Sequence, residues 1–207
     1  MARSLFLASF FKGVASLLPE FVGGACEGKK VCFVPTASIP EKVTFYVGAD
    51  RKAMVRLGMD VDDLEVSSAS KAEITDKITG ADYLFVSGGN TFFLLQELRR
   101  TGADSLVVAH ITSGKTYIGA SAGSMVLSEN LEYVCHMDSP KAAPDLGGDF
   151  TGLGVVDFCV VPHATNVPFK KAAQKILDTY SGALDLRPIS NDQAITVAGE
   201  TVQIVTR

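Results

Sequence analysis

The sequence predicts an α/β fold built on a doubly wound, mostly parallel sheet. Short apolar runs alternate with amphipathic segments along most of the 207 residues, which is typical of strands that are each followed by a helix. The runs are continuously apolar, as in parallel strands that helices cover on both faces. With 47% apolar and 20% charged residues, the chain can close one sizeable core. We expect a single domain over residues 1–207.

Five apolar runs are the expected strands. They are SLFLAS, KVCFVPT, ADYLFVSGG, KTYIGAS and FCVVPH. Each combines β-branched or aromatic residues with an end in Gly, Pro, Ser, Thr or His. A further strand is expected at 61–67, and the last residues, DQAITVAGETVQIVTR, contain two short runs around a Gly-Glu turn. This ending predicts a terminal β-hairpin.

Helical patterns lie between these runs, at about 41–57, 71–80, 91–102, 103–113 and 168–181. The N-terminal apolar stretch resembles a secretion signal, but Lys12 interrupts it and its apolar residues recur at helical spacing. We therefore expect a strand at 4–8 followed by an amphipathic helix. No apolar stretch approaches the roughly 20 residues of a membrane span, so the expected location is the cytoplasm, with no membrane partner.

Charge and cysteine content exclude several classes of function. Nineteen Lys and Arg residues against 23 Asp and Glu residues give a net charge of −4, and no basic cluster is present that would bind nucleic acid. The four cysteines have no C-x-x-C spacing and are interpreted as buried free thiols. We expect no metal and no cofactor.

Ser121 is the candidate nucleophile. It lies between small residues in GASAG, where a strand is expected to turn into a helix. A nucleophile elbow needs this pattern, because the tight turn leaves no room for large neighbours and lifts the Ser Oγ above the sheet. A Ser-capped helix after a Gly turn is the alternative. The helix that begins at Ala122 directs its N–H groups at the same point and would help to stabilise an oxyanion.

The segment SGGN, residues 87–90, follows another expected strand. Gly88 and Gly89 would let the backbone approach a bound group, so the N–H of Gly89 or Asn90 is a candidate partner of Ala122 in an oxyanion hole. A plain turn with Asn90 as the helix cap is the alternative. The spacing fits neither standard phosphate-binding glycine motif.

His163 is the candidate general base, because it follows the apolar run FCVVPH at the same edge of the sheet. Three residues are candidates for orienting its imidazole, and Asp138 is expected to matter most for turnover, because an ionised carboxylate stabilises the imidazolium. Asp138 lies between Ser121 and His163 in the chain, as the acid does in α/β-hydrolases. Asn191 and Asp192 follow the histidine, and either side chain can accept a hydrogen bond from it.

The motifs FVPTAS, SGGNTFFLLQEL, YIGASAGS, MDSP and VPHATN occur in this order. Together they resemble the peptidase E family of serine peptidases, which includes aspartyl dipeptidase and cyanophycinase. The resemblance implies a three-layer α/β/α sandwich similar to class I glutamine amidotransferases, a flavodoxin-like arrangement. It also implies Ser121 as nucleophile, His163 as base, and an oxyanion hole formed by the Gly89 and Ala122 amides.

The resemblance also implies roles for other residues, with two departures. Asp138 matches a position assigned either to the charge relay or to the substrate pocket, and Asn191 stands where relatives carry a Glu. The basic insertion associated with acidic substrates is absent after VPHATN, so Asp-Xaa specificity is in doubt, although Lys170 or Lys171 is a candidate cation. The remaining candidate substrate-binding residues are Gly88, Asn90, Asn166 and Asp192.

The expected function is hydrolysis of a small peptide, with a dipeptide as one candidate, through an acyl-enzyme on Ser121. An esterase or amidase acting on a non-peptide metabolite is the alternative enzyme. A binding protein with weakened turnover is the alternative outside enzymes, because Asn191 replaces an acidic residue. The expected assembly is a monomer or a homodimer.

Overall fold

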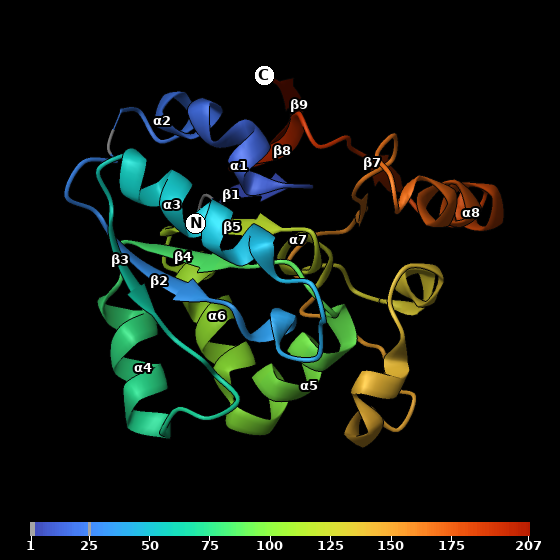
Figure 1. The fold of residues 1–207 in the computed structure, drawn as a ribbon, viewed down its shortest axis with the longest axis horizontal. Helices are drawn as coiled ribbons and strands as arrows, with labels where there is room; N and C mark the ends of the chain where they lie inside the picture. The colour runs from blue at the N-terminus through green and yellow to red at the C-terminus, as the bar shows by residue number, and fades with distance from the viewer. Residues whose placement is uncertain (1–2, 25) are drawn as a thin grey trace.

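A computed structural model describes residues 3–24 and 26–207. A central sheet has the strand order β3-β2-β4-β5-β1-β8-β9 (Figure 1). Its parallel strands, in that order, are β3 (Asp60–Asp63), β2 (Lys30–Val34), β4 (Tyr83–Val86), β5 (Thr116–Ala120) and β1 (Ser4–Ala8). β8 (Gln193–Ala198) pairs antiparallel with β1 and forms the predicted hairpin with β9 (Thr201–Thr206).

Helices cover both faces of this sheet, which confirms the predicted fold class (Figure 1). One face carries α1 (Phe11–Val14), α2 (Leu18–Phe21) and α3 (Phe45–Arg56). The other carries α4 (Lys71–Gly80), α5 (Thr91–Thr101) and α6 (Ala103–Thr112). α7 (Ala122–Met125) follows β5. α8 (Lys170–Tyr180) packs at the end of the molecule that carries two further strands, β6 (Cys159–Val161) and β7 (Leu186–Pro188).

The two cores explain why the predicted strands are apolar at every position. In β1, Leu5 and Leu7 belong to the core beneath α4, α5 and α6, whereas Phe6 and Ala8 belong to the core beneath α1, α2 and α3. All four side chains are fully buried. Successive side chains of a strand point to opposite faces, so a strand covered on both sides needs an apolar residue at each place.

The N-terminal helix differs from its prediction. In place of one amphipathic helix, the structure has α1, a 3₁₀ turn (η1, Ala15–Leu17) and α2. Pro19 lies in the first turn of α2. Because proline has no N–H to bond the carbonyl four residues back, a continuous helix is interrupted at this point.

The prediction that FCVVPH forms a strand of the main sheet is wrong. β6 (Cys159–Val161) instead pairs in parallel with β7 (Leu186–Pro188) in a separate two-stranded sheet. The place beside β1 is taken by β8, which pairs along all five residues of that strand. No helix within the described part of the chain is long and apolar enough to cross a membrane.

Candidate active site

Three neighbouring parallel strands, β4, β5 and β1, end at one edge of the sheet. Gly88, Ser121 and Ser9 follow these strand ends. β8 runs in the opposite direction, so the residues before it, including Asn191, lie at this edge as well. Ligands of open α/β sheets bind beyond the carboxyl ends of the strands, so a functional site is expected at this edge.

Ser121 stands on a strained turn between β5 and α7. Its φ of 47° and ψ of −104° are unusual for a residue with a side chain. A Cβ on Gly123 would lie 2.1 Å from the Val86 carbonyl oxygen, and one on Gly119 would lie 2.6 Å from the Gly123 oxygen. Positions 119 and 123, each two residues from Ser121, must therefore be glycine, and the turn has the geometry expected of a nucleophile elbow.

The structure brings His163 to Ser121, with 3.1 Å between His163 Nε2 and Ser121 Oγ. His163 lies two residues beyond β6 and has a φ of 58°. Its backbone N–H donates a hydrogen bond to Ser9 Oγ at 2.7 Å. Ser9 therefore fixes the histidine loop to the end of β1, although β6 is not part of the main sheet.

Asn191 is the residue that contacts the second imidazole nitrogen. Its Oδ1 lies 2.6 Å from His163 Nδ1 and also accepts a hydrogen bond from Ser9 Oγ at 2.9 Å. Since an amide oxygen can only accept, Nδ1 carries the proton and Nε2 is left free to accept one from Ser121. The arrangement is a Ser-His-Asn array with Ser9 as a second support.

Asn166 has a different place from the one expected. Its Oδ1 accepts the backbone N–H of Asn191 at 2.9 Å, and its own N–H donates to the His163 carbonyl at 3.0 Å. Asn166 does not line the cavity around Ser121. The prediction that it binds substrate is corrected: it joins the loops that carry His163 and Asn191.

Burial changes the pKa of His163. The ring of Phe169 stacks on that of His163 with 4.9 Å between centroids. Burial lowers the pKa of His163, and the hydrogen bond with Asn191 opposes that shift. A lowered pKa keeps the imidazole neutral near pH 7, as a general base must be.

Asp138 does not contact His163, and the prediction that it orients the imidazole is wrong. Its Oδ2 accepts hydrogen bonds from the Thr91 N–H at 2.8 Å and the Thr91 hydroxyl at 2.6 Å. The carboxylate therefore occupies the N-terminus of α5, where the helix dipole favours a negative charge. Burial raises the pKa of Asp138 to about 6, and the residue lines the same cavity as Ser121.

Asp192, the remaining acidic candidate, is exposed and hydrogen-bonded to Ser190. The Ser190 hydroxyl lowers the pKa of its carboxyl. Asp192 is not part of the cavity lining. The structure therefore supports neither predicted role of Asp192: it does not orient His163 and it does not bind substrate in this cavity.

Gly89 and Ala122 carry the two backbone amides that were predicted to form an oxyanion hole. Gly89 has a φ of 135°, and a Cβ there would lie 2.1 Å from the Ala37 carbonyl oxygen. Over residues 3–24 and 26–207, the N–H groups of Gly89 and Ala122 donate no hydrogen bond within the protein. Asn90 is the N-cap of α5, because its Oδ1 accepts a hydrogen bond from the Phe93 N–H at 3.0 Å.

These groups open into a cavity of about 650 Å³. Gly88 lines the cavity, and a Cβ added there would lie 3.4 Å from Ser121 Cβ. Its apolar wall includes Phe10, Val43, Phe45, Met137, Val167 and Phe169. No Lys or Arg side chain from the described residues lines it, so the candidate cations Lys170 and Lys171 are not in the lining.

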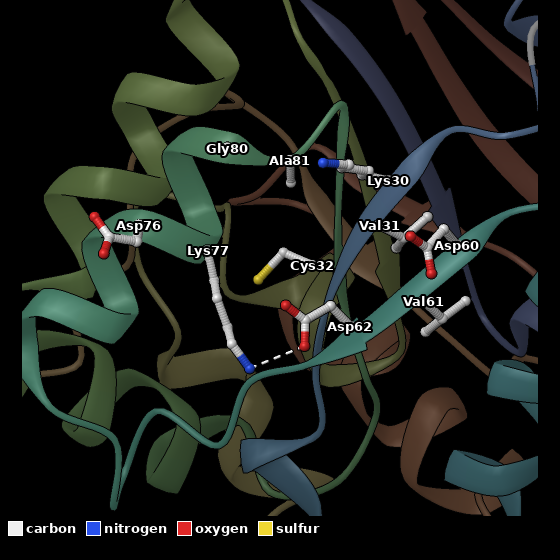
Figure 2. A pocket seen from close by; sticks show the side chains of 10 residues that line it. All are labelled: Lys30, Val31, Cys32, Asp60, Val61, Asp62, Asp76, Lys77, Gly80 and Ala81. Atoms are coloured by element: carbon white, nitrogen blue, oxygen red, sulfur yellow. Dashed lines mark hydrogen bonds and ion pairs between the residues drawn. The ribbon is translucent and has the colours of Figure 1, made fainter.

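A second cavity, of about 470 Å³, lies at the opposite edge of the sheet, at the amino ends of β2 and β3 and beside α4 (Figure 2). In it Lys77 Nζ contacts Asp62 Oδ1 at 2.9 Å. Burial raises the pKa of the Cys32 thiol to about 12. Neither cavity contains a metal site: the described residues hold no group of three His, Cys, Asp or Glu side chains suited to an ion.

Sequence reasoning missed Ser9 and Phe169. Ser9 ends the first apolar run, SLFLAS, so the rule that singled out the other strand ends applies to it as well. Phe169 follows VPHATN closely, but no periodic pattern marks it as a contact of His163.

The profile of peptidase family S51 matches residues 5–205. An uncharacterized peptidase of Pasteurella multocida is 54% identical over 199 residues, covering 96% of this chain and 95% of that protein. An uncharacterized peptidase of Listeria innocua is 48% identical over 200 residues, covering 97% and 95%. Peptidase E of Shewanella amazonensis is 31% identical over 134 residues, which are 65% of this chain and 53% of that protein.

A solved structure described as a peptidase E protein from Listeria monocytogenes superposes with a TM-score of 0.95 at 46% identity, over 100% of both chains. A peptidase from an acI-B1 actinobacterium has a TM-score of 0.72 at 24% identity and shares the fold. The match to the family covers nearly the whole described sheet, including the segments that carry Ser121, His163 and Asn191. The chain therefore belongs to peptidase family S51, the peptidase E family of serine peptidases.

Proposed function

We propose that the protein hydrolyses a small peptide through an acyl-enzyme on Ser121. The observation that carries the proposal is the 3.1 Å approach of His163 Nε2 to Ser121 Oγ, at an elbow that opens into a cavity of about 650 Å³. A cavity of this size accommodates a small molecule or a short peptide.

The reaction follows from the position of each group. Ser121 Oγ attacks the scissile carbonyl while His163 Nε2 takes its proton, and the Gly89 and Ala122 amides bind the resulting oxyanion. His163 then protonates the departing amine, which leaves the acyl group on Ser121. A water molecule, deprotonated by His163, releases the acyl group as a carboxylic acid.

Asn191 supports this sequence in a different way from a carboxylate. Its amide fixes the tautomer and direction of the imidazole but adds no full negative charge to stabilise the imidazolium. Ser9 supplies a second polar contact, with its Oγ 3.1 Å from His163 Nδ1. The neutral partner is also the observation that favours the alternative, a binding protein with weakened turnover.

A substrate panel tests the proposal. Wild type and Ser121→Ala would be compared on free dipeptides, with release of amino acids measured, and on p-nitrophenyl acetate. We expect cleavage of at least one dipeptide that depends on Ser121. Ester hydrolysis alone would indicate the esterase or amidase alternative, and the absence of both activities, together with failure to react with a fluorophosphonate, would indicate the binding protein.

A further inference from the structure

The segment Val167-Pro168-Phe169 forms an exposed apolar surface in the active-site cavity. All three residues line the cavity, between the histidine loop and the start of α8. Val167 has 87% of its surface exposed, and Phe169 has 37%. Apolar side chains that gather, exposed, in a concave site are typical of a surface that a ligand covers.

Phe169 places this surface beside the catalytic imidazole. Its ring stacks on that of His163, with 4.9 Å between the centroids and 28° between the planes. His163 Nε2 in turn lies 3.1 Å from Ser121 Oγ. The apolar surface is therefore on the histidine side of the nucleophile.

The chemistry assigns the histidine side to the leaving group. In the proposed reaction His163 Nε2 protonates the departing amine, and the two nitrogens must be within hydrogen-bond distance for this transfer. The amine nitrogen therefore lies next to Nε2 when its bond to the carbonyl carbon breaks. The side chain of the departing amino acid is attached one carbon beyond that nitrogen, within reach of the surface around Phe169.

Two of the carboxyl groups that line the cavity are already engaged elsewhere. Asp50 is 1% exposed, and one of its oxygens accepts the Lys12 backbone N–H at 2.9 Å. Asp138 accepts both the N–H and the hydroxyl of Thr91. No Lys or Arg of the described residues lines the cavity, so an acidic side chain would find no cation. An apolar side chain needs none, since it gains free energy by leaving water.

From this arrangement we infer that Val167, Pro168 and Phe169 form the subsite for the side chain of the leaving amino acid, and that this subsite selects a large apolar side chain. The inference rests on the proposed function, because it requires an acyl-enzyme on Ser121. It narrows the substrate class to peptides in which the residue after the scissile bond is apolar, such as leucine.

Acyl transfer measures this subsite without a known peptide substrate. p-Nitrophenyl acetate acetylates Ser121, and an added amine then competes with water for the acetyl group from the leaving-group side. The amine nitrogen attacks the acetyl carbonyl, its proton passes through His163 to Ser121 Oγ, and the ester bond breaks as an N-acetyl amide forms. The ratio of this amide to acetate, measured by mass spectrometry, reports how well the subsite holds each amine.

Three amines with side chains of nearly the same shape test the selectivity: leucinamide, asparaginamide and the α-amide of aspartic acid. At equal concentrations of free amine base, we expect leucinamide to capture the acetyl group about fivefold or more better than either of the others, because its side chain alone gains by contact with an apolar surface. The same mixtures with Ser121→Ala give the uncatalysed background, which is subtracted.

Val167 is the position to vary, because Phe169 also contacts the imidazole. Val167→Asp places a charge on the apolar surface and should lower the preference for leucinamide by about threefold or more. The preference is a ratio of products from one acyl-enzyme, so a change in overall rate does not affect it. Val55→Asp, at a half-exposed valine of α3 outside the cavity lining, is the matched control and should leave the preference unchanged.

Equal transfer to leucinamide and asparaginamide would overturn the inference, and so would a preference that Val167→Asp leaves unchanged. Val167→Asp could instead change the ratio of kcat/KM for p-nitrophenyl butyrate and acetate while the amine preference stays the same. That result would assign the surface to the acyl side chain and would also overturn the inference. Failure of the ester to acetylate Ser121 would contradict the proposed function itself, so the two failures are distinguishable.

Discussion

The two edges of the central sheet each carry a cavity. The polar groups of one cavity are paired, whereas the residues that line the other cavity include strained and unpaired groups. At the amino edge, Lys77 is paired with Asp62, and Cys32 is an inert buried thiol (Figure 2). At the carboxyl edge, Ser121 and His163 have positive φ angles, and the Tyr46 hydroxyl has no partner in the described structure.

The difference shows where the fold accepts a cost in stability. A strained backbone conformation costs on the order of 1–3 kcal/mol, and the two non-glycine residues with positive φ in the described chain, Ser121 and His163, both lie at one edge. The second cavity has comparable volume, and neither of these residues lines it. Cavity volume is therefore a poor guide to function here, whereas backbone strain identifies the site.

Removing the nucleophile should have the largest effect on activity of any change at either cavity. Ser121→Ala should lower kcat by about 10³-fold or more, because the array acts as a unit. The flanking glycines leave room for the smaller side chain, so the fold should persist in circular dichroism. Cys32→Ala in the other cavity should leave kcat within about twofold. Activity of Ser121→Ala close to wild type would remove Ser121 from the mechanism.

The second effect distinguishes Asn191 from Asp138. Asn191→Ala should lower kcat on the order of 10²-fold on both a dipeptide and an active ester, because the imidazole loses its orienting acceptor. Asp138→Asn should mainly raise KM for the dipeptide and spare the ester, since Asp138 contacts Thr91 and not His163. A loss of kcat on both substrates for Asp138→Asn alone would reverse this assignment.

The pH dependence of kcat/KM should reflect the burial of His163. The imidazole acts as a base only when neutral, and burial lowers its pKa from 6.5. Activity on an active ester should therefore rise with pH through an apparent pKa below 6.5. Asn191→Asp should move this transition to higher pH, because a carboxylate stabilises the imidazolium. An unchanged profile in Asn191→Asp would argue against the contact.

The smallest effect concerns stability. Asp50 has its pKa raised from 3.8 to about 7, so the native state loses stability relative to the unfolded state as pH rises from about 4 to 7. Asp50→Asn should raise the free energy of unfolding at pH 8 by roughly 1–4 kcal/mol and leave it nearly unchanged below pH 4.

Lys77→Met is the matched change at the other cavity. The Lys77–Asp62 pair is exposed, with 63% of the Asp62 side chain accessible, so its loss should cost less than about 1 kcal/mol. Denaturant titrations at both pH values measure the two effects. Destabilisation by Asp50→Asn at pH 8 would mean that the buried charge is compensated.

Local patterns were sufficient to predict most of the fold. The run of β1 and the helical spacing of α4 and α5 depend on neighbours in sequence, and the structure places these elements where they were predicted. The pairing of β6 with β7 depends on which strand lies beside β1, which no local pattern specifies. The same limit applies to His163: its approach to Ser121 was predicted from strand ends, but its partner could not be chosen between Asp138 and Asn191. Ser9 acts through contacts with His163 and Asn191, which are distant in sequence, so spacing alone did not reveal it.

The central claim is that Ser121 forms the covalent intermediate, and trapping that intermediate tests it most directly. The wild type would be quenched in acid during turnover of p-nitrophenyl acetate and then analysed by intact mass and peptide mapping. The account predicts one acetyl group on the peptide that contains Ser121, absent in Ser121→Ala and reduced in Asn191→Ala. An acetyl group on another residue, such as the exposed Cys135, or turnover with no adduct in either protein, would contradict it.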